Sequence, residues 1–115
     1  MIRLENVSIR RGASEILHGV STQIPAASVT AVVGRSGVGK TTLLGALNGL
    51  LRPSAGQISV SGLGPLDDAC LETHRRRTAT VFQTHALIDR LSALRNVLLG
   101  LADSRHPLSL LPWPQ

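Results

Sequence analysis

The chain has 115 residues, of which 43% are hydrophobic and only 2% aromatic, and its formal net charge is +5. This length suits one domain with a core of its own, and the composition excludes a disordered chain, a disulfide-rich scaffold and a membrane-spanning helix of about 20 apolar residues. The positive charge suits an acidic partner such as nucleotide, nucleic acid or a membrane surface, although a solvated basic surface explains it more simply.

The first third of the chain is predicted to form strands. Alternating apolar residues indicate a strand over Ile2–Ile9, and a turn separates it from a second strand over Ile16–Ile24. Val29–Val33 is short, rich in β-branched residues and apolar nearly throughout, which is typical of a strand buried on both faces. We therefore expect a sheet that continues directly into the glycine-rich segment that follows.

The middle of the chain alternates between predicted helices and strands. Leucines at helical spacing predict a helix over Lys40–Leu51, and a Pro- and Gly-containing turn then leads to a short strand over Gln57–Ser61. Residues 66–77 indicate a short helix or loop that ends in a basic run, and Thr78–Phe82 is predicted to be a further strand. Ser92–Leu101 has one apolar side and is predicted to be an amphipathic helix.

The most specific motif is a glycine-rich loop between the predicted buried strand and the predicted helix. It matches the pattern G-x-x-x-x-G-K-[ST], in which glycines let the backbone curl so that successive N–H groups face an anion. The start of the following helix adds unpaired N–H groups and the positive end of the helix dipole. The predicted phosphate-binding residues are Gly34, Arg35, Ser36, Gly37, Val38, Gly39, Lys40, Thr41 and Thr42.

Lys40 is the only lysine among the twelve basic residues of the chain, so this position uses a compact ammonium where arginine is used everywhere else. We expect Lys40 to reach the β- and γ-phosphates of a nucleoside triphosphate and Thr41 to ligate Mg²⁺. The alternative is a glycine-rich strand-to-helix turn without a ligand, which the match in both pattern and context disfavours.

From this loop onward the sequence resembles the ATP-binding subunits of ABC transporters. The loop has the family's G-x-S-G-x-G-K-[ST]-[ST] form, Asn48–Ile58 looks like the family's G-L-x-x-P-x-x-G-x-[IV] segment, and Arg75–Gln83 looks like the approach to its glutamine loop. Within the family, Leu87 and Arg90–Gly100 are most similar to the phosphonate-importer branch.

The resemblance implies an α/β fold with a P-loop NTPase-like core and an N-terminal antiparallel β portion. It covers residues 1–101 as the N-terminal part of an ATP-binding domain and stops before the family's helical subdomain, while residues 102–115 form a Pro/Leu-rich tail or an interrupted insertion. We expect the isolated chain to be poorly soluble or loosely folded, because a parallel neighbour of Val29–Val33 would lie in the part of the family's domain that has no counterpart here.

The resemblance also implies cofactors, partners and location. The cofactors are ATP and Mg²⁺, with Gln83 as a second contact to the metal and a possible contact to the attacking water. Arg11 stands near the place where relatives carry an aromatic residue beneath the adenine. The implied partners are transmembrane permease subunits and a second ATP-binding subunit, and the implied location is cytoplasmic, on the inner face of the cell membrane.

The sequence leaves catalysis open. None of the seven acidic residues follows a predicted buried strand, so no catalytic residue is assigned and we expect the chain to bind nucleotide without supplying the hydrolytic carboxylates. The first hypothesis is an importer's ATP-binding subunit that couples ATP binding and hydrolysis to transport of a phosphonate. The second is a non-catalytic nucleotide-binding module. A nucleic-acid-binding role is the least favoured, since the basic run His74–Arg77 lacks interleaved aromatics and suits a solvated or interface surface.

Overall fold

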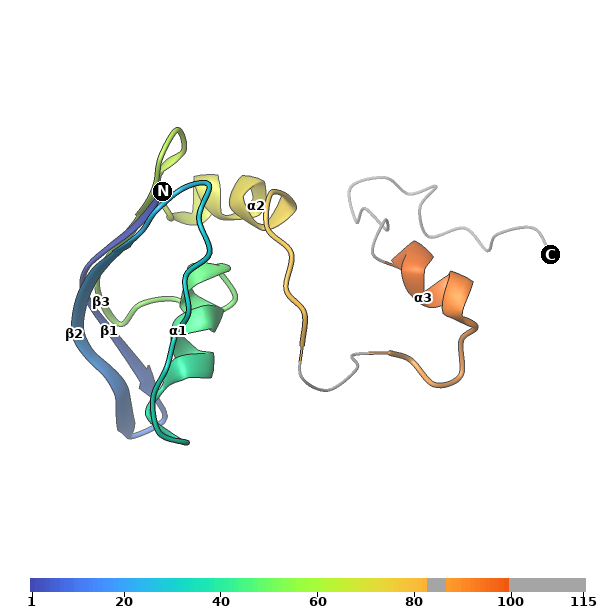
Figure 1. The fold of residues 1–115 in the computed structure, drawn as a ribbon, viewed down its shortest axis with the longest axis horizontal. Coiled ribbons are helices and arrows are strands. Elements are labelled where there is room, and N and C mark those ends of the chain that lie inside the picture. Colours follow the sequence, from blue (N-terminus) through green and yellow to red (C-terminus); the bar gives the residue numbers. More distant parts are fainter. Residues whose placement is uncertain (83–86, 100–115) are drawn as a thin grey trace. The chain divides into compact units, whose positions relative to one another are not determined.

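A computed structural model of the chain describes residues 1–82 and 87–99. The chain divides into two compact units, Met1–Thr80 and Val81–Gln115. The first unit contains a sheet with two helices, and the second contains one described helix (Figure 1). Among the described residues, no helix combines the length and the apolar character that a membrane crossing requires.

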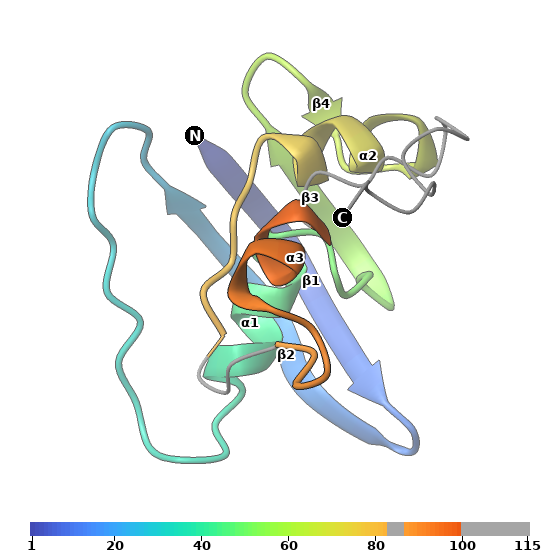
Figure 2. The ribbon, with the colours of Figure 1, turned by 90° about the vertical axis from the view of Figure 1, so that its right-hand side faces the viewer.

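The first unit is built on a four-stranded antiparallel sheet with the strand order β2-β1-β3-β4. The long hairpin predicted at the N-terminus is present as β1 and β2, and β3 matches the predicted short strand. Figure 2 shows these strands face on. The strands span Ile2–Arg11 (β1), Ser14–Ile24 (β2), Ala55–Val60 (β3) and Gly64–Pro65 (β4).

The imperfect alternation of apolar residues in β1 has a structural cause. Leu4 and Val7 are both buried although they are three residues apart, because Asn6 between them adopts a positive φ of 50° and shifts the register of the strand. On the neighbouring strand Gly56 has a φ of 79°, and a Cβ atom there would lie 2.2 Å from the carbonyl oxygen of Asn6. The two irregularities fit together only because residue 56 has no side chain.

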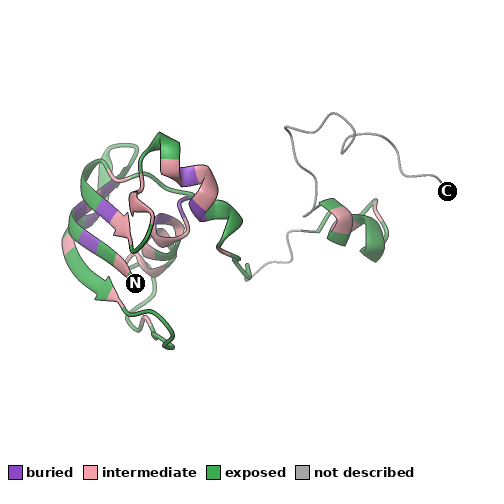
Figure 3. Cartoon of the chain, turned by 90° about the horizontal axis from the view of Figure 1, so that it is seen from above, coloured by how far each residue is buried: buried purple, intermediate pink, exposed green. Residues whose placement is uncertain are grey.

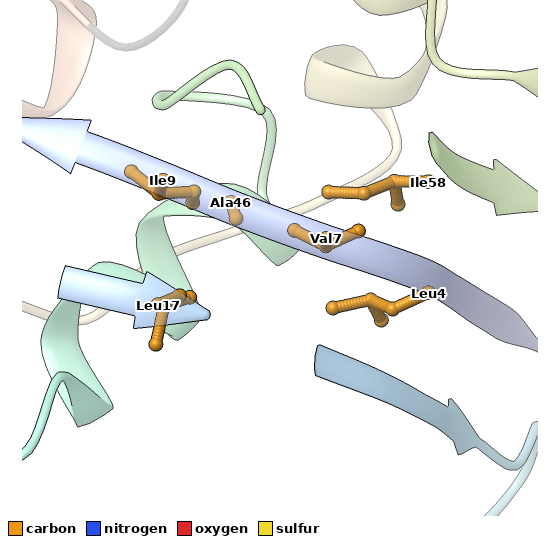
Figure 4. Close-up of a cluster of buried hydrophobic side chains, with 6 residues drawn as sticks. All are labelled: Leu4, Val7, Ile9, Leu17, Ala46 and Ile58. Atoms are coloured by element: carbon orange, nitrogen blue, oxygen red, sulfur yellow. The ribbon is translucent and has the colours of Figure 1, made fainter. Parts of the chain in front are cut away.

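The core lies between the sheet and helix α1 (Lys40–Leu47), which packs on the face that carries the buried residues of β1. Figure 4 shows these side chains converging from the strands and from Ala46 on the helix. Partly buried Leu43 and Leu47 extend the contact along the same helix. The buried cluster comprises Leu4, Val7, Ile9, Leu17, Ala46 and Ile58.

Helix α1 ends four residues earlier than the leucine pattern predicts. Gly49 has a φ of 74°, its N–H donates to the carbonyl of Ala46 at 3.1 Å, and the N–H of Leu50 donates to the carbonyl of Gly45 at 2.8 Å. These bonds form a Schellman motif, which ends a helix at a residue that tolerates a left-handed backbone. Leu50 and Leu51, which the periodicity had placed on the helix, are exposed.

Helix α2 (Asp68–Arg76) confirms a helix within residues 66–77. The Asp67 carboxylate accepts hydrogen bonds from the N–H groups of Ala69 at 3.1 Å and Cys70 at 3.0 Å, and so caps the first turn. In the second unit, α3 (Ala93–Leu99) lies within the helix predicted over Ser92–Leu101 and buries no residue among those described (Figure 3).

Two predicted strands are not strands in the structure. Val29–Val33 and Thr78–Phe82 pair with no other described segment, and their side chains are largely exposed, with Val29 fully so and Val81 99% exposed. The prediction of a strand buried on both faces at Val29–Val33 is therefore wrong for this structure. A strand needs a neighbour to receive its backbone hydrogen bonds, and apolar composition alone does not supply one.

Candidate phosphate-binding site

The glycine-rich loop joins the exposed segment Val29–Val33 to the first turn of α1. Gly37 has a φ of 80° and Gly39, at the N-cap of the helix, has a φ of 102°. A side chain would be strained at both positions, so two glycines of the motif are explained by backbone conformation. Gly34 has no positive φ, and a Cβ atom there would lie 3.1 Å from Cγ1 of Val38, which makes it a position of close approach.

The loop and the start of α1 present backbone N–H groups without acceptors. Only Val38 donates within the loop, to the carbonyl of Arg35 at 3.4 Å, and the first helical bond runs from Leu43 to the carbonyl of Gly39 at 2.8 Å. No side chain caps this helix end. Unpaired N–H groups at a helix start next to left-handed residues form a ready site for an anion. In the described part of the chain, the N–H groups with no acceptor therefore include those of Gly37, Gly39, Lys40, Thr41 and Thr42.

The Lys40 side chain folds back over the loop. Its ammonium group donates to the carbonyl oxygen of Gly34 at 2.8 Å and to that of Arg35 at 2.7 Å. The structure thus brings the single lysine and the glycine-rich backbone together. The cation is held at the loop by these two bonds, which places positive charge beside the unpaired amides.

The two threonines of the motif lie in the first turn of α1. The Thr41 side chain is exposed and its hydroxyl has no hydrogen bond among the described residues, while Thr42 is half-buried. An exposed hydroxyl beside a phosphate site fits Mg²⁺, which binds oxygen ligands, keeps several waters and shares substrate phosphates. No cluster of three His, Cys, Asp or Glu side chains occurs within residues 1–82 and 87–99.

The hairpin holds the loop in place from one side. A Cβ atom on Gly39 would lie 2.9 Å from Cδ2 of Leu17 and 3.3 Å from Cγ2 of Ile16, so the loop backbone packs directly on β2. Arg11 is exposed at the end of β1, opposite Ser14 in the hairpin. Gln83, the predicted metal contact, lies outside the described residues.

The far end of α1 is held by two residues whose role the sequence analysis missed. Nε2 of His74 lies 2.7 Å from the carbonyl oxygen of Leu47, and because a carbonyl only accepts, this nitrogen carries the proton. The Arg75 guanidinium donates twice to the carbonyl oxygen of Gly49, at 3.0 and 2.6 Å. The signal available in the sequence was the spacing of Leu71 and His74, which share one face of α2 and are both buried.

The basic run at His74–Arg77 is therefore not simply a solvated surface. His74 is only 3% exposed, and the exposed Arg75 donates to a carbonyl at the end of α1, so both residues have structural contacts. Asn48 adds a further link, since its Nδ2 donates to Oγ1 of Thr80 at 2.8 Å. These contacts join the phosphate-loop helix to the segment that precedes Gln83.

Cys70 is the single cysteine and is not part of the loop. Its Sγ atom donates to the carbonyl oxygen of Leu63 at 3.3 Å. Partial burial, together with the neighbouring Asp67 carboxylate, raises the pKa of the Cys70 thiol. The thiol is therefore a poor nucleophile at neutral pH.

Comparison with known proteins agrees with this geometry. A family model described as "ABC transporter" matches residues 17–112. A phosphonates import ATP-binding protein from Rhodopseudomonas palustris is 58% identical over 99% of this chain and 40% of that protein. A phosphite import ATP-binding protein from Stutzerimonas stutzeri is 41% identical over all of this chain and 42% of that protein.

Solved structures show the same likeness in three dimensions. A dimeric bacterial ABC transporter cassette matches with a TM-score of 0.72 and 34% identity over 88% of this chain. A dimeric ATP-binding cassette in a post-hydrolysis state, bound to ADP and Pi, matches with a TM-score of 0.71 and 33% identity over the same share. The chain spans 40% to 47% of the length of these four proteins.

Proposed function

The chain belongs to the ABC transporter family, and we propose that its loop at residues 34–42 binds the triphosphate of Mg-ATP as the N-terminal portion of an importer's ATP-binding subunit. The observation that carries this proposal is the placement of the Lys40 ammonium over a loop with unpaired amides. Likeness to phosphonate and phosphite import proteins supports a phosphorus oxyanion as the transported substrate.

In this proposal each part of the loop has a separate task. The unpaired N–H groups around Gly37 and Gly39 bind phosphate oxygens, and the start of α1 adds its dipole. Lys40 moves one or more of its N–H donors from the loop carbonyls to the terminal phosphates. Mg²⁺, when bound, neutralises phosphate charge, and the Thr41 hydroxyl together with Gln83 would hold it.

The proposed setting is an assembled transporter. The partners are transmembrane permease subunits and a second ATP-binding subunit, with the chain on the cytoplasmic face of the membrane. Family membership supports this arrangement, and the two dimeric cassettes support pairing of two ATP-binding subunits.

A second candidate function is nucleotide binding without turnover, and the placement of the carboxylates favours it for this chain. The loop contains no acidic residue. Within the described residues, Glu15 lies 3.6 Å from His18, Asp67 caps α2, and the carboxylates of Glu5, Asp68 and Glu72 contact arginines. These five groups have tasks elsewhere and Asp89 belongs to the second unit, whereas hydrolysis needs a carboxylate positioned at the attacking water.

Titration calorimetry of the purified chain with Mg-ATP tests binding, and release of inorganic phosphate tests turnover. Lys40→Ala should abolish the binding heat, while Arg3→Ala should leave it unchanged, because Arg3 lies on the sheet and its guanidinium lies 3.8 Å from the Glu5 carboxylate. Equal binding by Lys40→Ala and the unchanged chain would contradict the proposed site. Phosphate release above that of Lys40→Ala would contradict binding without turnover.

A further inference from the structure

Asn48 and Gly49, at the end of α1, form a dipeptide whose chemistry the proposed function does not use. An asparagine followed by glycine can lose its side-chain amide, because the backbone nitrogen of the glycine attacks the asparagine Cγ atom to form a cyclic succinimide. Glycine favours this step, since it has no side chain to obstruct the approach of its nitrogen. The chain has three asparagines, and the other two, Asn6 and Asn96, precede β-branched valines.

The fold holds both reacting groups of this dipeptide in other hydrogen bonds. The Gly49 N–H, which must lose its proton before the nitrogen can attack, donates to the carbonyl oxygen of Ala46 at 3.1 Å. The Asn48 carboxamide is fixed at both ends, since its Nδ2 donates to Oγ1 of Thr80 at 2.8 Å and its Oδ1 accepts from the N–H of Leu50 at 3.1 Å. Ring closure requires the carboxamide to turn toward the Gly49 nitrogen, so the fold opposes it.

Helix α2 covers the nitrogen that would attack. Gly49 is buried, and a Cβ atom there would lie 2.7 Å from Cδ1 of Leu71 and 3.5 Å from Cδ2 of His74. The Arg75 guanidinium donates twice to the carbonyl oxygen of the same glycine. A buried, hydrogen-bonded amide gives up its proton to solvent only when the structure opens locally. Reaction at this amide therefore depends on separation of α2 from the end of α1.

We propose that Asn48 is a site of spontaneous deamidation, and that the packing of α2 on the end of α1 keeps it unreacted in the folded chain. The Gly49 nitrogen forms a bond to Cγ of Asn48, the bond from Cγ to Nδ2 breaks, and the leaving amide takes the proton of the Gly49 N–H to depart as ammonia. Water, the only co-reactant, then opens the ring at either of its carbonyls and gives aspartate or isoaspartate.

Neither product fits the site that protected the asparagine. An aspartate at position 48 has no N–H to donate to Thr80, and it places a negative charge at the carboxyl end of α1, where the helix dipole is already negative. Isoaspartate adds a methylene group to the backbone within the Schellman motif. The reaction thus converts a local opening of this helix end into a lasting change.

Incubation of the full chain at mildly alkaline pH, followed by peptide mass spectrometry, tests the proposal. In guanidinium chloride, Asn48 should convert faster than Asn6 and Asn96, and without denaturant its conversion should be at least about tenfold slower. Equal rates at the three asparagines in denaturant would remove Asn48 as the reactive site. Equal rates of Asn48 conversion with and without denaturant would overturn protection by the fold.

Matched variants locate the protection. Arg75→Ala removes both donors from the carbonyl of Gly49 and should speed conversion without denaturant by about 5- to 30-fold. Arg77→Ala, at an exposed neighbour, should leave the rate unchanged. Thr80→Val removes only the acceptor of the Asn48 Nδ2 group and should speed conversion by less than Arg75→Ala. If neither Arg75→Ala nor Thr80→Val reacts faster than Arg77→Ala, these contacts do not protect the site and the inference fails.

Discussion

Val7 and Val29 are both valines in segments whose sequences favour extended backbone. The side chain of Val7 is completely buried, whereas that of Val29 is completely exposed. Val7 belongs to β1, which has hydrogen-bonded neighbours on both sides. Val29 belongs to an extended segment that pairs with no described residue. The difference is the presence of neighbouring strands, since both sequences favour extended backbone.

The comparison separates two kinds of extended segment, one that is paired in this structure and one that is not. The paired strands are antiparallel, and a tight hairpin turn joins β1 to β2. Val29–Val33 and Thr78–Phe82 have the apolar composition of strands in parallel sheets, whose neighbours come through longer crossover connections. The expected poor solubility of the isolated chain stays a prediction, and these two segments are its physical basis.

The largest effect is expected from a substitution in the paired region, at the close approach between the backbones of β1 and β3. Gly56→Ala places a Cβ atom 2.2 Å from the carbonyl oxygen of Asn6 at a φ of 79°, so strain and overlap combine. We expect a loss of about 3–5 kcal/mol in the free energy of unfolding, measured with urea. Gly62→Ala is the control, because it has a similar φ of 77° but open space around it, and it should cost only about 1–2 kcal/mol. Equal losses would show that overlap with Asn6 plays no part.

The comparison of Val7 with Val29 is itself measurable. Val7→Ala removes two methyl groups from a filled core and should lower the free energy of unfolding by about 2–3 kcal/mol. Val29→Ala removes the same groups from solvent and should change it by less than about 0.5 kcal/mol. A large effect of Val29→Ala would mean that this segment is covered in solution, and the contrast between the two regions would fail.

A smaller effect is expected at the end of α2, where Arg75 contacts the end of α1. Arg75→Ala leaves the carbonyl of Gly49 without two of its donors and should cost about 1–2 kcal/mol in urea unfolding. Arg77→Ala removes an exposed neighbour and should cost less than about 0.5 kcal/mol. If the two substitutions cost about the same free energy of unfolding, the hydrogen bonds of Arg75 would add no stability, and the whole basic run would be described as a solvated surface.

The smallest effect is a pH dependence in the well-packed unit. Because its pKa is raised above the usual value of a thiol, the Cys70 side chain holds its proton to higher pH in the folded chain than in the unfolded chain. Its contribution to stability is therefore present below the unfolded pKa and is lost as the pH rises through the folded pKa. Alkylation by iodoacetamide should reach half its maximal rate at a higher pH in the folded chain than in the urea-unfolded chain. Coincident profiles would contradict a raised pKa.

The backbone conformation of the glycine-rich loop can be predicted from the sequence because its constraints are local, while phosphate binding there stays a prediction. The positive φ angles of Gly37 and Gly39 and the position of Lys40 follow from a motif nine residues long. The hairpin is also predictable, since alternation over adjacent segments suffices. The burial of Val29–Val33 is not, because it depends on strands that are distant in sequence.

Other differences come from signals that were present but outweighed. The end of α1 was predictable from Asn48-Gly49, a common stop signal, yet the leucine periodicity favoured a longer helix. The role of His74 depends on where α2 packs against Leu47, 27 residues away, and composition describes only its charge. Asn6 shifts the register of β1 through one left-handed residue, which alternation cannot anticipate.

The ammonium of Lys40 has three protons, and two of them already point at the carbonyls of Gly34 and Arg35. An incoming ligand thus meets the third N–H group of the ammonium, whose direction is fixed by the two N–H groups that are already hydrogen-bonded. A guanidinium is planar and cannot donate to those two carbonyls with the same geometry. Arginine, which the chain uses for every other strongly basic side chain, would therefore not replace lysine at this position.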